Sequence, residues 1–540
     1  MKKNSFIEGT IVATMGILIV KIIGILYVIP FNAIIGETGG ALYGYGYNIY
    51  QLFLSISSAG FPFAISKLTS EYYALGKKSA IRDTYNVSLK IISIISIVMF
   101  VILFVFAPSI GRLIIGSSLG GNTSDDIAFV IRAVSFAILI IPFLSVTKGL
   151  LQGYKYITPY SVSQVIEQVV RVIIVLVGSL TCIKILNIPL RYAIGVSMLG
   201  AFFGGLVAYI YLRTKIRKSN LLEVSDEEKS SLISKNEIAK KIFMYSIPFI
   251  LISLVNNLYT TVDMILLSRT MSDILKYPAN IMESIVGVYT TWGVKLNNII
   301  LAISTGLVTS LIPNIVTSYT KGDMKDVNDK FNKAMQCVLL VIVPMTIFLS
   351  LLVKPVWTLF YGNSYYGPIV YKVFVYTALF GGFYTIIINT LQGLSKYKLV
   401  MMSVLSGLLT NAILDVPLML LCDKIGLNVS YGAVFAAIIG YILSITISMS
   451  TLRNKYGFDF TSTRKRLPKY IASFIIFTLV ILIMKLFIST NINSRLLSIV
   501  VLFVYGVVSF LVYIIINRRN GNIRVVFGNK INNFLKKMHL

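Results

Sequence analysis

The sequence predicts an all-α membrane protein that crosses the bilayer about fourteen times. Hydrophobic residues make up 56% of the 540-residue chain, charged residues only 13%, and the mean hydropathy is +0.82. About a quarter of the residues in soluble domains are charged, so this composition is typical of a protein embedded in lipid. A helix needs roughly 20 predominantly apolar residues to cross a hydrocarbon core about 30 Å thick. Segments of this kind recur along the whole chain, as expected for a polytopic helical membrane protein.

The expected spans are separated by short polar segments. They lie near residues 6–29, 43–66, 86–107, 128–151, 159–183, 190–212, 242–267, 281–312, 335–353, 368–391, 399–421, 430–451, 470–489 and 496–516. The first apolar run is too long for a signal peptide, and no small-residue cleavage site follows it. The longest polar stretch, residues 213–241, is too short for a folded soluble domain.

Basic residues are distributed unevenly between the two sides of the predicted membrane. If the N-terminus is cytoplasmic, the inside segments hold clusters such as Lys77, Lys78 and Arg82, while the outside loops hold only scattered cations. This asymmetry follows the positive-inside rule and predicts a plasma-membrane protein with both termini in the cytoplasm. Basic tails beside anionic lipid account for the net charge of +28 without a nucleic-acid partner.

Short motifs recur in order along the two halves of the chain. "LQGYKY" at Leu151 returns as "LQGLSK" at Leu391, a shift of 240 residues, and Gly76 corresponds to Gly322 at a shift of 246. The matches predict two six-helix lobes in a parallel pseudo-repeat, with the substrate path between them. The expected organisation is an N-terminal lobe (1–213), a cytoplasmic amphipathic linker (214–241), a C-terminal lobe (242–452), two final transmembrane helices (453–516) and a basic cytoplasmic tail (517–540).

Two lysines interrupt predicted spans. Lys21 stands about fourteen residues into the first span, roughly 21 Å deep, and Lys295 lies near the middle of the eighth span, just before Asn298. Intramembrane charges cost about 2.5–3.5 kcal/mol each and usually face a polar interior. For Lys21 the alternative is that its stem extends to the outer interface. We expect both ammonium groups and Asn298 to line a cavity that binds an anion, since lysine suits phosphate oxygens.

The fifth predicted span carries a polar face. Gln164, Glu167, Gln168 and Arg171 are three or four residues apart and therefore share one side of the helix. Glu167 and Arg171 are spaced to form an ion pair that serves packing. In the alternative, Arg171 reaches the substrate while Glu167 orients it, and Gln164 contributes to the same binding site.

Two further carboxylates, Asp263 and Asp415, stand in otherwise apolar segments. Each is either a coupling site for a proton or Na⁺ or a structural bond to a neighbouring helix. The chain has three scattered cysteines and one histidine, so we expect no metal site, no cofactor and no catalytic residues.

Two long stretches are similar to a known family. The opening "GTIVATMGILIVKIIGILYVIPFNAIIGETGGALYGYGYNIYQLFLSISSAGFPFAISKLTSEYYALG" and the later "LLQGYKYITPYSVSQVIEQVVRVI" resemble the polysaccharide-biosynthesis exporters of the MOP superfamily. The resemblance is strongest to lipid II flippases of the MurJ/YtgP type and to their relative, stage V sporulation protein B. It extends over essentially the whole chain.

The resemblance implies a MATE/MOP-like fold of two six-helix lobes plus a final helix pair that forms a lipid-tail groove. It also implies that the protein moves undecaprenyl-pyrophosphate-linked lipid II from the inner to the outer leaflet by alternating access. Lys21 and Lys295 fall where the MurJ type has arginines that hold the pyrophosphate. A further arginine of that family corresponds to Tyr27, and an acidic residue to Val294, so the sequence departs from the family pattern at both positions.

Several alternatives to a lipid II flippase remain open from the sequence. They are an exporter of another lipid-linked oligosaccharide of capsule or teichoic type, a MATE-type cation-coupled drug exporter, a membrane enzyme and a scaffold in a cell-wall complex. We expect a transporter without enzymatic activity, driven by the membrane potential or by a Na⁺ or H⁺ gradient. The expected partners are a lipid-linked pyrophosphoryl glycan, membrane lipids and the cell-wall synthesis machinery, with the protein itself a monomer.

Overall fold

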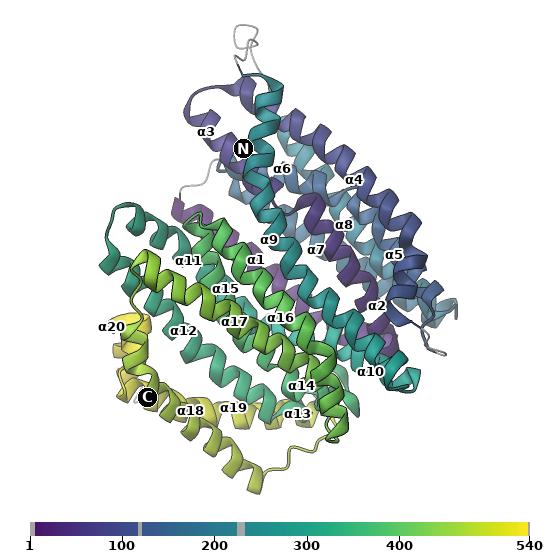
Figure 1. The fold of residues 1–540 in the computed structure, drawn as a ribbon, viewed down its shortest axis with the longest axis vertical. Helices are drawn as coiled ribbons and strands as arrows, with labels where there is room; N and C mark the ends of the chain where they lie inside the picture. The colour runs from purple at the N-terminus through teal and green to yellow at the C-terminus, as the bar shows by residue number, and fades with distance from the viewer. Residues whose placement is uncertain (1–5, 117–120, 224–232, 538–540) are drawn as a thin grey trace. The chain divides into compact units, whose positions relative to one another are not determined.

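The computed structural model describes residues 6–116, 121–223 and 233–537, and the regular elements in these ranges are all helices (Figure 1). Twelve of the described helical segments are long and apolar enough to cross a membrane. The first helix, with a shorter apolar segment at Met15–Leu26, and the helix at residues 293–320 occupy the remaining two predicted spans. Each of the fourteen predicted segments overlaps a helix, so the predicted fold class is confirmed.

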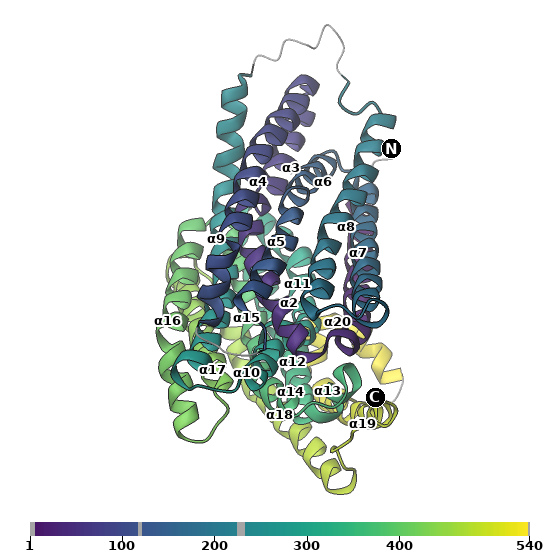
Figure 2. The ribbon, with the colours of Figure 1, turned by 90° about the vertical axis from the view of Figure 1, so that its right-hand side faces the viewer.

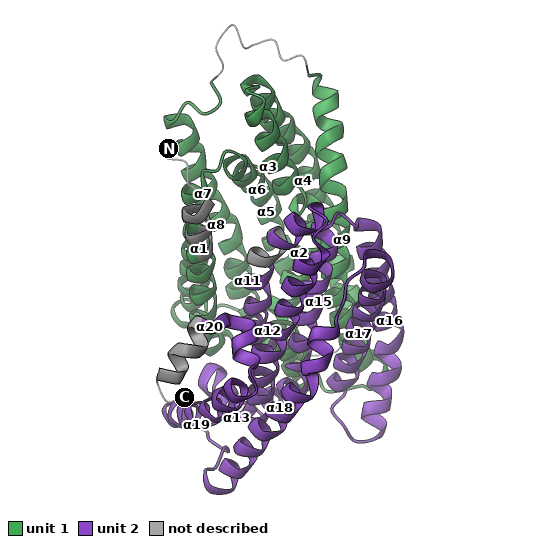
Figure 3. Ribbon diagram, turned by 90° about the vertical axis from the view of Figure 1, so that its left-hand side faces the viewer, with its two compact units in different colours: residues 1–291 green, residues 292–540 purple. Residues whose placement is uncertain are grey.

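The chain divides into two compact units, Met1–Thr291 and Trp292–Leu540, which Figure 3 colours green and purple. The helices of unit 1 are α1 (Phe6–Leu26), α2 (Val28–Ser58), α3 (Phe61–Ala74), α4 (Lys78–Ile115), α5 (Ser124–Ile138), α6 (Ile141–Gly153), α7 (Ile157–Leu180), α8 (Leu190–Lys218), α9 (Lys235–Arg269) and α10 (Ala279–Gly287). Single π-helical turns, η1 (Thr181–Ile185) and η3 (Thr270–Ile274), extend α7 and α9.

A third π-helical turn, η4 (Val288–Trp292), contains the boundary between the units. The helices of unit 2 are α11 (Gly293–Thr320), α12 (Met324–Leu351), α13 (Val353–Tyr361), α14 (Tyr366–Phe374), α15 (Tyr376–Gly393), α16 (Tyr397–Lys424), α17 (Ser430–Tyr456), α18 (Thr461–Phe487), α19 (Arg495–Arg519) and α20 (Asn522–Lys537).

The compact units place α9 with the helices that precede it, because α9 packs against α2, α3 and α4 in unit 1 (Figure 2). The lobes at 1–213 and 242–452 are defined by repeats in the sequence, whereas the compact units are defined by packing. The division into lobes remains a prediction. The described parts of the predicted linker are the end of α8, the turn that follows it and the start of α9. Residues 224–232 of the linker lie outside the described residues.

Two turns support the repeated plan. Lys155 (φ 65°) and Ser395 (φ 57°) both adopt the left-handed region, directly after α6 and α15 respectively. In each turn the next amide donates to the carbonyl of the leucine that begins the motif, at 2.8 Å for Leu151 and 2.9 Å for Leu391. Glycine occupies the matching position after α3 and α11, where Gly76 (φ 71°) and Gly322 (φ 75°) turn the chain. The same local geometry at corresponding positions is expected of a duplicated unit.

Small residues bring α7 and α8 into close backbone contact. A Cβ atom on Gly204 of α8 would lie 2.5 Å from the Glu167 carbonyl oxygen, and one on Gly200 would lie 3.0 Å from the Arg171 carbonyl oxygen. Lipid supplies no hydrophobic force between helices, so close approach at small residues stabilises their packing. In unit 2, a glycine likewise brings α16 and α17 into close backbone contact, since a Cβ atom on Gly432 would lie 2.2 Å from the Met419 nitrogen.

The α7–α8 contact yields a first prediction. Gly204→Ala places a methyl group against the backbone of α7, which cannot yield as a flexible side chain can, so overpacking should destabilise the protein by about 1–3 kcal/mol. The measurement is thermal unfolding of the purified protein in mild detergent. Gly381→Ala is the matched control, because its Cβ atom would lie at an ordinary 3.5 Å from Leu301 Cδ2. Equal stability of the two variants would contradict the prediction.

Candidate functional site

A cavity of about 400 Å³ lies between α1, α6 and α7 in unit 1. Its apolar wall consists of Ile17, Val20, Ile141 and Leu144, and its polar wall of Lys21, Ser145, Lys148, Gln164, Glu167, Gln168 and Arg171. Four residues predicted from the sequence to bind substrate are therefore neighbours in this cavity, namely Lys21, Gln164, Glu167 and Arg171. Lys21 lines it from α1, and the other three from α7.

The polar face of α7 is directed into the cavity by packing on two sides. On one side, α8 approaches the α7 backbone at Gly200 and Gly204. On another, α1 approaches through Gly16, where a Cβ atom would lie 2.9 Å from Ser161 Cβ, and through Gly24, where it would lie 3.5 Å from Gln168 Nε2. The three- and four-residue spacing of the polar side chains then places them on the cavity side of α7.

Glu167 bridges two cations. Its Oε2 accepts a hydrogen bond from Lys148 Nζ at 2.8 Å, and its Oε1 accepts one from Arg171 at 2.9 Å. The three side chains are 18%, 14% and 24% exposed respectively, so these charges are largely removed from solvent. The predicted pair of Glu167 with Arg171 is confirmed, and the structure adds Lys148 from α6.

The cavity carries an excess of positive charge. Lys21, Lys148 and Arg171 contribute three cations and Glu167 one anion, which gives a formal net charge of +2. Lys21 is half-buried, and among the described residues it has no ion-pair partner. A half-buried cation without a counter-ion favours an anionic ligand in the same cavity.

Two polar atoms of the wall side chains are buried and have no hydrogen-bond partner among the described residues. Gln164 donates through Nε2 to the Tyr160 hydroxyl at 3.0 Å, while its Oε1 is buried and has no hydrogen-bond partner among the described residues. Arg171 Nε is likewise buried and without a partner in the described part of the chain. Buried polar groups normally have partners, so the hydrogen bonding of these two side chains is incomplete in the part of the chain that the structure describes.

Aromatic side chains of α2 lie near Arg171. The guanidinium lies near Tyr43, Tyr47 and Tyr50. Tyr43 and Tyr47 stack with ring centroids 5.6 Å apart. Tyr27, which stands where the resembling family has an arginine, is buried beside Phe31 with ring centroids 6.0 Å apart. Tyr27 therefore packs in an aromatic cluster and does not line the cavity.

Lys148 is a site residue that the sequence did not reveal, because it lies close to the end of a span and resembles an ordinary cytoplasmic cation. One feature of the sequence does point to Lys148. It lies inside the apolar run that ends in "LLQG", and the next predicted span carries a carboxylate. A cation and a carboxylate buried in consecutive spans are candidates for pairing.

The remaining predicted binding residues, Lys295 and Asn298, lie on α11 in unit 2. Lys295 is half-buried and Asn298 is exposed. The neighbouring Asn297 is buried and donates to the Phe374 carbonyl at 3.3 Å and the Thr377 hydroxyl at 2.9 Å. Asn297 therefore fixes α11 to α14 and α15, whereas the role of Lys295 and Asn298 in binding stays a prediction.

The two predicted coupling carboxylates are both buried. Asp263 on α9 accepts a hydrogen bond from the Tyr289 hydroxyl at 2.8 Å. Asp415 lies on α16, one helical turn after the buried Asn411, in a stripe that packs toward α17. Among the described residues, no group of three or more His, Cys, Asp or Glu side chains is arranged to hold a metal ion.

Comparison with known proteins agrees with this architecture. A family model described as "Polysaccharide biosynthesis protein" matches residues 6–319. The chain belongs to the polysaccharide biosynthesis protein family. Among curated relatives in this family, it is 30% identical to "Lipid II flippase MurJ" of Bacillus subtilis, with 99% of both chains covered. It is 24% identical to "Stage V sporulation protein B" of the same organism, with 84% of each chain covered.

Solved structures share the fold of this family member. A structure titled "Lipid II flippase MurJ, inward closed conformation" matches with a TM-score of 0.65 at 16% identity, covering 95% of this chain and 99% of the other. An inward-facing MATE-family multidrug transporter of the MOP superfamily matches with a TM-score of 0.63 at 13% identity, covering 84% and 96%. The protein is therefore a multi-pass bacterial membrane protein that shares the fold of these structures, as the sequence predicted.

The bridge at Glu167 yields a second prediction. Glu167→Gln should destabilise the protein strongly, because it leaves two largely buried cations without their shared counter-ion. In a double-mutant cycle of Glu167→Gln and Lys148→Met, the coupling free energy should be about 1 kcal/mol or more. The measurement is chemical unfolding in mixed micelles. A cycle of Glu167→Gln with the exposed Lys398→Met is the control, and a Lys148 coupling no larger than this control would refute the bridge.

Proposed function

We propose that the protein is a flippase that moves lipid II, an undecaprenyl-pyrophosphate-linked cell-wall precursor, from the inner to the outer leaflet by alternating access. The observation that carries this proposal is the cationic cavity of α1, α6 and α7 in a chain 30% identical along its full length to a lipid II flippase. The function is transport without a chemical step, so the protein is not an enzyme.

The cavity chemistry supports an anionic substrate. A pyrophosphate presents several acceptor oxygens, and the ammonium groups of Lys21 and Lys148 and the guanidinium of Arg171 are charge-assisted donors. We propose that Lys21, Arg171 and Gln164 contact the pyrophosphate, with Glu167 orienting Arg171. We propose that Lys295 and Asn298 of unit 2 also contact the substrate during transport.

An apolar groove in unit 2 supports a substrate with a long hydrocarbon tail. The groove is about 350 Å³ in volume and lies between α12, α19 and α20. It is lined by Leu340, Val341, Pro344, Met345, Phe510, Tyr513, Ile514, Asn517, Ile523 and Phe527. We propose that the prenyl chain lies along this groove while the head group crosses the membrane.

Orientation and energy source complete the proposal. Both termini would be cytoplasmic, as the distribution of basic residues predicts. Asp263 and Asp415 would couple transport to a Na⁺ or H⁺ gradient, with the membrane potential as the other source of energy. The protein would act as a monomer in the plasma membrane, next to the cell-wall synthesis machinery.

Four other functions are alternatives to lipid II transport. An exporter of a capsule-type or teichoic-type oligosaccharide would recognise the same lipid anchor, so the cavity serves either substrate. A MATE-type drug exporter needs acidic side chains to hold cationic drugs, and the excess of cations around Lys21 disfavours it. A membrane enzyme or a scaffold has no specific support from the described site.

A third prediction tests the cationic residues. In bacterial cells depleted of their own lipid II flippase, the parent protein should restore growth. Lys21→Ala and Lys295→Ala should each weaken substrate binding by roughly 10-fold to 100-fold, because one charge-assisted hydrogen bond is lost. Both variants should therefore fail to restore growth at membrane levels equal to the parent. Growth is scored by colony formation, and the exposed Lys398→Ala is the matched control.

The outcomes of this experiment separate the possibilities. Rescue by both lysine variants would contradict the role of the lysines, although the parent would still be a flippase. Failure of a well-expressed parent would contradict lipid II as the substrate and favour another lipid-linked glycan.

A fourth prediction tests the apolar groove. Val341→Trp fills the groove with a larger side chain and should slow transport of lipid II with a full-length undecaprenyl chain by about tenfold or more, given the cost of overpacking. Transport of an analogue with a short prenyl chain should change little. The measurement is leaflet exchange in proteoliposomes, with the lipid-exposed Val500→Trp as control. Equal slowing of both substrates would argue against a tail-binding groove.

A further inference from the structure

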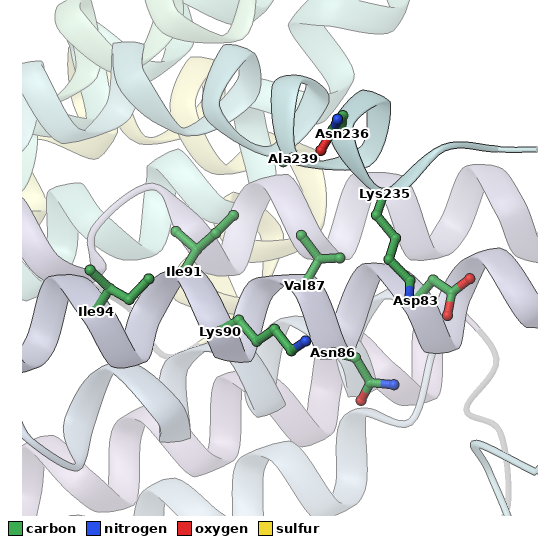
Figure 4. Close-up of a pocket in the computed structure, with 9 residues that line it drawn as sticks. All are labelled: Asp83, Asn86, Val87, Lys90, Ile91, Ile94, Lys235, Asn236 and Ala239. Carbon is green, nitrogen blue, oxygen red and sulfur yellow. The ribbon is translucent and has the colours of Figure 1, made fainter.

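A second polar hollow in unit 1 lies apart from the cationic cavity and shares no residue with it. It has a volume of about 450 Å³ and lies between α4 and the start of α9 (Figure 4). Its polar lining consists of Asp83, Asn86, Lys90, Lys235 and Asn236, and its apolar lining of Val87, Ile91, Ile94 and Ala239. We refer to this hollow as the α4–α9 groove.

The lining of the α4–α9 groove changes from polar to apolar along α4. Asp83 and Asn86 come first, Lys90 follows one turn later, and Ile91 and Ile94 lie beyond it (Figure 4). Lys90 is the last charged residue before an uncharged run that extends from residue 91 to residue 111. At 1.5 Å per residue this run is roughly 31 Å long, which matches the thickness of the hydrocarbon core. Lys90 therefore marks the boundary between hydrocarbon and head groups.

The same side of α4 is exposed from Asn86 to Val101. Asn86, Lys90 and Ile94 are exposed, and the stripe continues through Ile97 at 56% and Val101 at 48% exposed. Large exposed apolar side chains on a membrane helix contact lipid tails. The groove therefore opens at the lipid-facing surface, with its apolar end at the depth of acyl chains and its polar end at the depth of head groups.

The charges of the groove favour an anion. Lys90 and Lys235 supply two cations against the single carboxylate of Asp83, whose Oδ1 lies 4.0 Å from Arg82 Nε. Figure 4 shows the Lys235 side chain extending from the start of α9 toward Asp83, and the Lys90 side chain lying along α4 toward Asn86. Two ammonium groups from different helices thus flank a space that also presents the amide groups of Asn86 and Asn236.

We propose that the α4–α9 groove binds an anionic phospholipid such as phosphatidylglycerol. The lipid phosphate would accept hydrogen bonds from Lys90 and Lys235, and one acyl chain would lie against Ile91 and Ile94. Basic pockets between membrane helices at the head-group level bind anionic lipid in this way. The bound lipid would connect α4 to the first turn of α9, the point where the chain re-enters helix after the linker.

The test is native mass spectrometry of the full-length protein in detergent, titrated with dioleoyl phosphatidylglycerol and, separately, with dioleoyl phosphatidylcholine. The parent should bind one phosphatidylglycerol more tightly than any phosphatidylcholine. Lys90→Gln/Lys235→Gln should weaken this binding by roughly 25-fold, since each lysine near a membrane surface contributes about a factor of five. Lys235→Gln alone, at the exposed start of α9, should weaken it by about fivefold and guards against a folding defect of the double variant.

The matched control is Lys77→Gln/Lys240→Gln, which removes two exposed cations near the same helix ends but outside the groove lining. Unchanged phosphatidylglycerol affinity in this control, with weakened affinity in the groove variants, would support the site. Equal weakening in both double variants, or no preference of the parent for phosphatidylglycerol, would overturn it. Displacement of the lipid by soluble glycerol phosphate at similar concentration would also overturn it, because the groove would then bind phosphate and not lipid.

Discussion

The close backbone contact between α7 and α8 is the interaction on which the cationic cavity depends. Gly200 and Gly204 let the carbonyl groups of Arg171 and Glu167 approach α8 more closely than any larger residue would permit. Membrane helices gain little from burying apolar surface against one another, so shape at such contacts determines their position. Once the backbone of α7 is fixed, its helical geometry leaves its polar side chains no direction other than the space toward α1 and α6.

The sequence predicts those parts of the site that follow from one helix at a time. Gln164, Glu167 and Arg171 are recognisable because helical spacing places them on one face, and Lys21 because a charge interrupts an apolar run. Lys148 is different, since its role depends on how α6 packs against α7 after the left-handed turn at Lys155. The sequence also does not predict that tyrosines of α2 lie near Arg171, because tertiary packing sets the position of α2 relative to α7.

The fold shows a similar division. Apolar length predicts where the chain crosses the membrane, and each predicted segment contains a helix. It does not predict that several spans consist of two consecutive helices. Gly60, between α2 and α3, illustrates why: a Cβ atom there would lie 2.2 Å from the Ser246 carbonyl oxygen of α9. The helix breaks where it contacts a residue almost two hundred positions away in sequence. A local sequence pattern cannot predict such a contact.

The position of Glu167 also bears on the transporter when no substrate is bound. Under the proposed function, an anion that enters the cavity would compete with this carboxylate for Lys148 and Arg171, so carboxylate and substrate would be alternative partners of the same two cations. Without substrate, Glu167 is the counter-ion of these two cations, whereas Lys21 has no ion-pair partner among the described residues. The bridge therefore lowers the cost of holding Lys148 and Arg171 in the low-dielectric membrane interior when no substrate is bound. Glu167 would thus replace the negative charge of the substrate while the empty transporter returns to its starting conformation.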